Sequence, residues 1–131
     1  MRYLLDTQAL LWWRDASRRL GRRARQVIER DAHSIHISAG SIWEIAVKAG
    51  AGRLRLRDPL DRWMPDILER HGFVTLDITV AHAVAVAALP RHHPDPFDRL
   101  LIAQAQLEEL TIVTSDTAFE DYDVKLLDAR T

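Results

Sequence analysis

The chain has 131 residues, of which 47% are hydrophobic and 28% charged, with no cysteine and a formal net charge of −1. This composition excludes a disordered chain, a collagen-like repeat and a disulfide scaffold, and the lack of cysteine excludes thiol catalysis and cysteine-based metal sites. At this length we expect a single domain, residues 1–131, whose core buries roughly two-thirds of the surface of the unfolded chain.

Short apolar runs alternate with helical patterns along the whole chain. In chain order we expect a strand at Arg2–Leu5, helices at Thr7–Trp13 and Leu20–Asp31, a strand at Ile35–Ser38, helices at Ser41–Ala49 and Pro59–Arg70, a strand at Phe73–Leu76, helices at Val80–Leu89 and Pro96–Leu110, a strand at Thr111–Thr114, a short helix at Thr117–Phe119 and a strand at Val124–Leu127. Strands separated by helices predict an α/β fold with a parallel sheet flanked by helices on both faces.

The residue pattern of the helix that starts at Pro96 predicts how deeply this helix is buried. Its apolar residues, Leu107 among them, leave a narrow polar side at Gln104, Gln106 and Glu108, so we expect the helix to be largely buried. Asp95 directly before Pro96 fits an N-cap followed by proline at the first helical position.

No segment is long and apolar enough to span a bilayer. The longest uncharged run, Ile78–Pro90, has 13 residues, whereas a membrane-spanning helix needs roughly 20. An acid at position 6 also interrupts the apolar N-terminal stretch where a signal peptide would continue. The sequence therefore predicts a cytoplasmic protein without membrane contact.

Charges are unevenly distributed along the chain. Between Arg14 and Arg30 seven arginines stand against two acids, and from Gln106 to Thr131 seven acids stand against two bases. The arginine run fits a solvated helix face, and it also fits a basic patch that meets phosphates or an acidic partner. Because aromatic residues are not regularly interleaved with the arginines, the run alone is a weak indication of nucleic-acid binding.

Four acids are expected near the carboxyl ends of the strands, where ligands collect in open parallel α/β sheets. Asp6 directly follows the first strand and Asp116 the fourth. Glu44 lies about one helical turn after the second strand, and Asp98 lies in the first turn of the helix that leads into the fourth strand. If the first and fourth strands are neighbours, all four acids face one cleft.

Each acid also has an ordinary structural interpretation. Asp6 and Asp116 could cap the short helices that follow them, Glu44 could pair with Lys48 one turn on, and Asp98 could be an acid that the helix dipole favours. The joint placement is harder to explain in this way, since crowded carboxylates raise one another's pKa unless cations are present. Hard cations with oxygen ligands, Mg²⁺ or Mn²⁺, are the expected solution.

A divalent cation held by carboxylates suits phosphodiester hydrolysis. It polarises the phosphoryl oxygen, lowers the pKa of an attacking water and stabilises the leaving oxygen, with one ion or two. Such chemistry requires no serine or cysteine nucleophile, and the sequence suggests none.

Four segments carry a specific resemblance to PIN-domain ribonucleases, and more narrowly to VapC-type toxins of bacterial toxin–antitoxin pairs. They cover essentially the whole chain in the right order, and the second and third are the most specific. The segments are Leu4–Thr7 (LLDT), Ser41–Lys48 (SIWEIAVK), Asp95–Ala105 (DPFDRLLIAQA) and Val113–Asp116 (VTSD).

The resemblance implies a five-stranded parallel sheet and a Mg²⁺-dependent endoribonuclease that cleaves cellular RNA and forms a homodimer. It also implies inhibition by a VapB-like antitoxin whose tail enters the active-site groove. Carried over residue by residue, the catalytic and metal-binding acids are Asp6, Glu44, Asp98 and Asp116. One departure is Gln8, where relatives with this leader often carry histidine.

Several other residues are candidates for the surroundings of the site. Thr7 and Ser115 fit polar neighbours of a metal ion or its waters, and Lys48 could orient Glu44 or contact RNA. Arg99 could hold an acid in place or touch phosphate, and a purely structural role is also open to it.

Three histidines lie in helical or loop segments near these acids. His92, His93 and Asp95 lack the spacing of a structural zinc site, so we expect a surface loop there, with a histidine such as His93 bordering the substrate groove. His82, on an alanine- and valine-rich helix, is expected to be a hydrogen-bonded structural histidine.

Trp12 and Trp13 are adjacent on a short helix, so we do not expect both to point into one core. We expect one of them to help form a dimer or antitoxin surface.

Two other functions remain open from sequence. A non-catalytic RNA- or protein-binding module on the same fold is the main alternative, and metal-dependent turnover would distinguish it from an enzyme. A DNA-directed nuclease is the other, although the chain is short for additional DNA-gripping elements.

Overall fold

The computed structural model describes all residues from Met1 to Thr131 and contains one sheet of five parallel strands. The strands lie in the order β3-β2-β1-β4-β5, and every neighbouring pair is parallel. The strands are β1 (Tyr3–Leu5), β2 (Ile35–Ser38), β3 (Val74–Leu76), β4 (Thr111–Thr114) and β5 (Leu126–Asp128). The α/β fold with a five-stranded parallel sheet is therefore confirmed.

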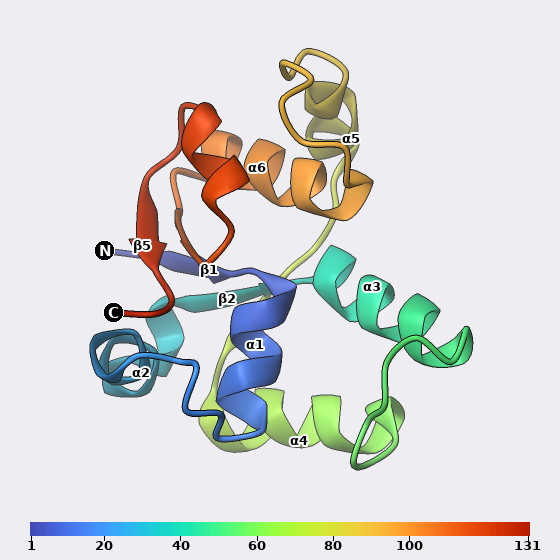
Figure 1. Cartoon of the computed structure of the whole chain (residues 1–131), viewed down its shortest axis with the longest axis vertical. Helices are drawn as coiled ribbons and strands as arrows, with labels where there is room; N and C mark the ends of the chain where they lie inside the picture. Colours follow the sequence, from blue (N-terminus) through green and yellow to red (C-terminus); the bar gives the residue numbers. More distant parts are fainter.

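Helices cover both faces of this sheet (Figure 1). In Figure 1, α5 and α6 lie above the sheet, whereas α1, α2 and α4 lie below it. The helices are α1 (Thr7–Arg14), α2 (Arg22–Arg30), α3 (Ala39–Gly50), α4 (Leu60–His71), α5 (Val80–Val86) and α6 (Pro96–Glu108), with 3₁₀ turns η1 (Ala32–Ser34) and η2 (Thr117–Asp121). None of the helices is both long and apolar enough to cross a membrane.

The core consists of two apolar clusters, one on each face of the sheet. Successive residues of a strand point to opposite faces, and β1 illustrates this. Leu5 packs in the cluster between the sheet and α1, α2 and α4, and Leu4 packs in the cluster between the sheet and α6. Val113 and Ile112 of β4 divide in the same way. Because β1 and β4 are covered on both faces, apolar residues follow one another directly in their sequences, as at Leu4–Leu5 and Ile112–Val113.

Every predicted helix and strand is present, and most of their ends lie within one or two residues of the predicted ones. The helix predicted at Val80–Leu89 ends at Val86, and β5 begins at Leu126 instead of Val124 because its ladder with β4 pairs Leu126 with Ile112. α6 stops at Glu108, since Glu109 adopts a left-handed conformation with φ 56° that ends the helix.

The polar side predicted for α6 was partly wrong. Gln104 is fully buried, whereas Leu107 is half exposed. Gln104 Oε1 accepts a 2.6 Å hydrogen bond from Ser38 Oγ, which itself accepts from the Gly40 N–H and so caps α3. The buried glutamine therefore ties α6 to the end of β2 and the start of α3, which fixes two of the elements around the site.

His82 has the structural role that its sequence context predicts. It is buried, forms a reciprocal cap with Thr79 at the start of α5, and its Nε2 lies 3.2 Å from Glu108 Oε1. The prediction is confirmed.

The expectation that Trp12 and Trp13 do not both point into one core was wrong, whereas the expectation that one of them helps form a partner surface stays a prediction. Trp12 is a buried member of the lower apolar cluster, and Trp13 packs against the same cluster, with its ring edge on His71 and Phe73. Both fit because α4 and β3 extend this cluster sideways under α1. The tryptophan that is exposed is Trp43 on α3, which is 59% accessible.

Candidate active site

The strand order brings the four predicted acids to one end of the sheet. β1 and β4 are direct neighbours, so Asp6 after β1 and Asp116 after β4 lie side by side. Glu44 reaches the same place from α3, and Asp98 from the first turn of α6. All four line one cavity of about 420 Å³, together with Thr7, Gln8, Leu11, Lys48, Arg53, Leu54, Asp95 and Ser115.

Asp6 is buried and both of its carboxylate oxygens are hydrogen-bonded. Oδ1 accepts from the Ala9 N–H at 2.7 Å, which caps α1 as the sequence allowed, and Oδ2 accepts from Thr114 Oγ1 of β4 at 2.5 Å. Burial nevertheless raises the pKa of Asp6 from 3.8 to about 6, because desolvation of the charge outweighs these two hydrogen bonds. Capping and site formation are thus not alternatives for this residue.

Glu44 is buried beside Asp6 and is held from two directions. Thr7 Oγ1 donates to Oε1 at 2.6 Å, and Lys48 Nζ lies 2.5 Å from Oε2. The hydrogen bond to Glu44 raises the pKa of Lys48, so the ammonium form is favoured. Thr7 and Lys48 therefore orient Glu44. The ion pair between Glu44 and Lys48 that the sequence suggested is present, but it is partly buried and lines the cavity.

Asp98 has the fewest polar partners of the four acids. The one side chain that pairs with it is His93, whose Nε2 lies 3.0 Å from Oδ2. Burial first, and then the charge of Asp95, raise the pKa of Asp98 to about 7. A carboxylate that is buried there without a donor of its own is suited to an external cation.

Asp116 is half exposed and shares His93 with Asp98. Its Oδ1 accepts from the Ala118 N–H and so caps η2, while its Oδ2 hydrogen-bonds to His93 Nε2 at 2.9 Å. The Nε2 atom and one oxygen of each of the two aspartates lie within 4.8 Å of one another. His93 thus lies between the two acids from β4 and α6.

The predicted surface loop is confirmed at Arg91, His92 and Pro94, which are exposed, whereas His93 itself turns inward and borders the acids. The residue His93 is 8% exposed, and its Nδ1 accepts from the Asp95 N–H at 3.1 Å. Tyr122 OH accepts the His92 and His93 N–H groups and donates to Pro90 O, which pulls the loop inward. Tyr122 lies 29 residues away in sequence, so no local pattern could have indicated this anchor.

Arg99 has a structural role and contacts none of the acids. Its guanidinium donates to the carbonyls of Pro90 and Val86 and lies 3.3 Å from Tyr122 OH. Of the three roles that the sequence left open, the structural one fits these contacts, holding an acid was wrong, and touching a phosphate stays a prediction. Asp95 caps α6 through the Phe97 N–H as predicted, and Ser115 lines the cavity.

The electrostatics of the cavity favour a hard cation. Five acids line it, whereas its only bases are Lys48, which is already paired with Glu44, and Arg53. Carboxylate oxygens are the ligands that Mg²⁺ and Mn²⁺ prefer, and a divalent ion would offset the burial and the repulsion that raise the two aspartate pKa values. The acidic lining of this cavity therefore fits such an ion.

A family model described as "PIN domain" matches residues 3–125, which includes all four acids. The chain belongs to the PIN-domain family. Domains of this family are generally nucleases and typically use divalent metal ions. No curated protein sequence is a significant match to the PIN chain.

Several solved structures share the fold over nearly the whole chain. VapBC2 from Rickettsia felis, bound to a DNA fragment from its promoter, superposes with a TM-score of 0.71 at 16% identity, covering 97% of this chain and 98% of that one. A toxin–antitoxin complex from Klebsiella pneumoniae gives 0.66 at 21% identity, covering 97% of both chains. DNA-bound VapBC from Salmonella typhimurium gives 0.69 at 17% identity, covering 98% of both.

The raised pKa values of Asp6 and Asp98 predict a pH-dependent stability of the metal-free PIN domain. Between about pH 4 and pH 7 the folded chain keeps protons on these carboxyls that the unfolded chain has released. The free energy of unfolding must therefore fall as the pH rises through this range, by on the order of a few kcal/mol. Urea unfolding in EDTA at about pH 5 and pH 8 measures this.

The variant Asp98→Asn isolates one of the two contributions. It cannot ionise, so its loss of stability between the two pH values should be smaller than that of the unchanged chain. Asp121→Asn at an exposed position is the matched control, and its free energy of unfolding should fall between the two pH values as steeply as that of the unchanged chain. Equal pH dependence of all three proteins would contradict the assignment.

Proposed function

We propose that this PIN domain is a Mg²⁺-dependent endoribonuclease that acts as the toxin of a toxin–antitoxin pair. The observation that carries the proposal is the convergence of Asp6, Glu44, Asp98 and Asp116 in one cavity. The resemblance of the four sequence segments to VapC-type toxins and the toxin–antitoxin complexes among the structural relatives support it. The main alternative, a binding module without catalysis, gives no reason to keep all four acids.

The side chains would divide the work in the following way. Asp6 and Asp116 come from the neighbouring strands β1 and β4, and Glu44 and Asp98 come from α3 and α6, so that a cation can be held between these four elements. A bound Mg²⁺ ion would supply Lewis acidity to the scissile phosphodiester and to the attacking water. Thr7, Lys48 and Thr114 keep two of the carboxylates in fixed rotamers.

The segment that follows α3 supports RNA as the substrate. It reads Arg-Leu-Arg-Leu-Arg at residues 53–57, and its leucines pack against the core while its arginines are exposed. No acid pairs with these three arginines, and Arg53 lines the acidic cavity itself. None of the arginines between Arg14 and Arg30 lines that cavity. Free guanidinium groups beside a phosphodiesterase site suit the backbone of a nucleic acid.

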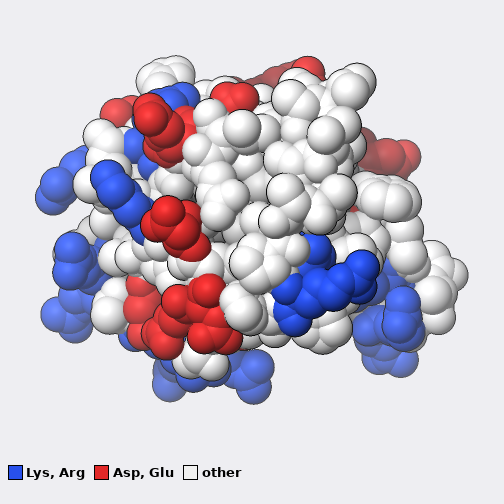
Figure 2. All heavy atoms as spheres, turned by 90° about the horizontal axis from the view of Figure 1, so that it is seen from above, with Lys and Arg blue, Asp and Glu red and all other residues white.

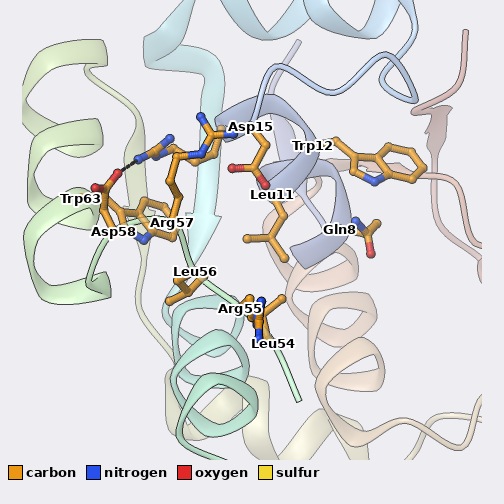
Figure 3. Close-up of a pocket in the computed structure, with 11 residues that line it drawn as sticks. Gln8, Leu11, Trp12, Asp15, Leu54, Arg55, Leu56, Arg57, Asp58 and Trp63 are labelled. Carbon is orange, nitrogen blue, oxygen red and sulfur yellow. Dashed lines mark hydrogen bonds and ion pairs between the residues drawn. The ribbon is translucent and has the colours of Figure 1, made fainter. Parts of the chain in front are cut away.

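A second hollow beside the site supports an antitoxin partner. It has a volume of about 140 Å³ and lies between α1, α4 and residues 54–58 (Figure 3). It shares Gln8, Leu11 and Leu54 with the acidic cavity, so the two hollows are neighbours and together offer a groove to a partner. We propose that a VapB-like antitoxin inhibits the enzyme by laying its tail along this groove.

An apolar face on α5 supports a homodimer. Val80 and Val84 are 81% and 66% exposed, and Ile78 lies against Gly40 of α3. Seen from above, this region is a broad area without charged side chains (Figure 2). Large exposed apolar patches mark interaction surfaces, and a second copy is the proposed occupant. Sedimentation velocity checks this, because a chain that stays monomeric at micromolar concentration would contradict it.

Replacing Asp98 or Asp6 with asparagine should abolish RNA cleavage, because each removes a charged ligand from the cavity. The measurement is cleavage of total cellular RNA by purified protein in the presence of Mg²⁺, with circular dichroism as the check of folding. Asp121→Asn is the matched control and should cleave as the unchanged chain does. Undiminished cleavage by Asp98→Asn, or by the unchanged chain in excess EDTA, would overturn the proposal.

Replacing Arg53, Arg55 and Arg57 together with glutamine should weaken RNA binding without emptying the acidic site. If the three arginines bind phosphates, the slope of log affinity against log salt should fall by about 0.7 for each phosphate that is no longer neutralised. Binding of a single-stranded RNA by the Asp98→Asn chain at several salt concentrations measures this. The control replaces Arg22, Arg23 and Arg30 on α2, and equal losses in both triple variants would contradict a track along residues 53–57.

A further inference from the structure

The histidine between Asp98 and Asp116 has a fixed role that the four-acid site does not explain. Its imidazole is buried and borders the two acids through one nitrogen, Nε2. It therefore could act as a metal ligand, as a hydrogen-bond donor to the acids, or as packing only. The surroundings of the other nitrogen decide between these roles.

The hydrogen bond at Nδ1 assigns the tautomer. Nδ1 lies 3.1 Å from the backbone nitrogen of Asp95, and that group can only donate. Nδ1 must therefore accept, so the ring proton is on Nε2, where it faces Oδ2 of Asp116 at 2.9 Å. Binding a metal ion through Nε2 would move the proton to Nδ1 and set two donors against each other.

The loop that carries the histidine is anchored independently of the acids. Tyr122 OH accepts the His93 N–H at 2.8 Å, and Arg99 and Tyr122 both donate to Pro90 O. Asp95 begins α6 directly after the loop, with Phe97 N–H on its side chain. The loop therefore has anchors other than the two acids that the ring faces.

We propose that His93 is a positioning residue. Its neutral Nε2–H group donates to Asp116 and lies next to the Asp98 carboxylate, and so holds both acids in the geometry that a cation requires. The inference rests on the proposed metal-dependent function and adds a residue to it. A donor between two like-charged carboxylates from different elements reduces their repulsion and fixes the rotamer of Asp116. Groups that orient ligands in this way typically change metal affinity by about 10- to 100-fold when they are removed.

Two substitutions at this position separate the roles. In His93→Gln, the amide nitrogen retains a donor at a similar reach, whereas His93→Leu removes the donor and keeps a similar volume. His92→Leu is the matched control, since that side chain is exposed and contacts the Tyr122 ring, not the acids. Isothermal titration of each protein with Mg²⁺ gives the affinities.

We expect His93→Leu to bind Mg²⁺ about 10- to 100-fold more weakly, His93→Gln to stay close to the unchanged chain, and His92→Leu to match it. Equal weakening in His93→Gln and His93→Leu would indicate direct ligation and overturn the proposal. Unchanged affinity in His93→Leu would also overturn it, while leaving the proposed function intact. If the unchanged chain bound no Mg²⁺, the proposed function would fail first.

A second measurement needs no substitution and no metal ion. Long-range ¹⁵N–¹H correlation spectra of the metal-free chain distinguish the two imidazole tautomers. The Nε2–H form is expected for His93, and the Nδ1–H form or a doubly protonated ring at about pH 7.5 would overturn the proposal even if the variants failed to fold.

Discussion

The candidate site depends on the pairing of β1 with β4. These strands are 108 residues apart at their functional ends, yet Thr114 Oγ1 donates directly to Asp6 Oδ2. Parallel pairing puts both carboxyl ends at the same edge of the sheet, so each strand delivers an acid to the same place. The remaining acids then come from α3 and α6, whose positions are tied together by the Ser38–Gln104 hydrogen bond.

In this arrangement, burial of Asp6 and Asp98 opposes their ionisation. Asp6 and Asp98 would be more stable in the folded chain if they were neutral, and their raised pKa values express that conflict. Apolar packing on both faces of a central strand holds Asp6 in place. A divalent cation would reverse the balance, because it favours the charged forms that burial opposes. The same feature that weakens the metal-free domain would therefore make it bind metal tightly.

Much of the fold and the acid set could be predicted from sequence because both are encoded locally. Strand runs, helix caps and the position of each acid relative to its strand are properties of a few neighbouring residues, as at Asp95 and Pro96. The surroundings of His93 could not be predicted, because they depend on Tyr122 reaching back across the fold to the loop. The predictions for Gln104 and Trp13 were wrong for the same reason, because partners on β2, α4 and β3 decide how these side chains are buried.

The central claim is that the four carboxylates act as one cation site, and proton release on metal binding tests it most directly. At about pH 6.5 the buried aspartates hold on the order of one proton between them, which a cation must displace. Titration with Mg²⁺ in two buffers of different ionisation enthalpy counts the protons released. The account predicts saturable binding with release of about one proton, falling towards zero at about pH 8.5. Absence of binding, or binding without proton release at pH 6.5, would contradict it.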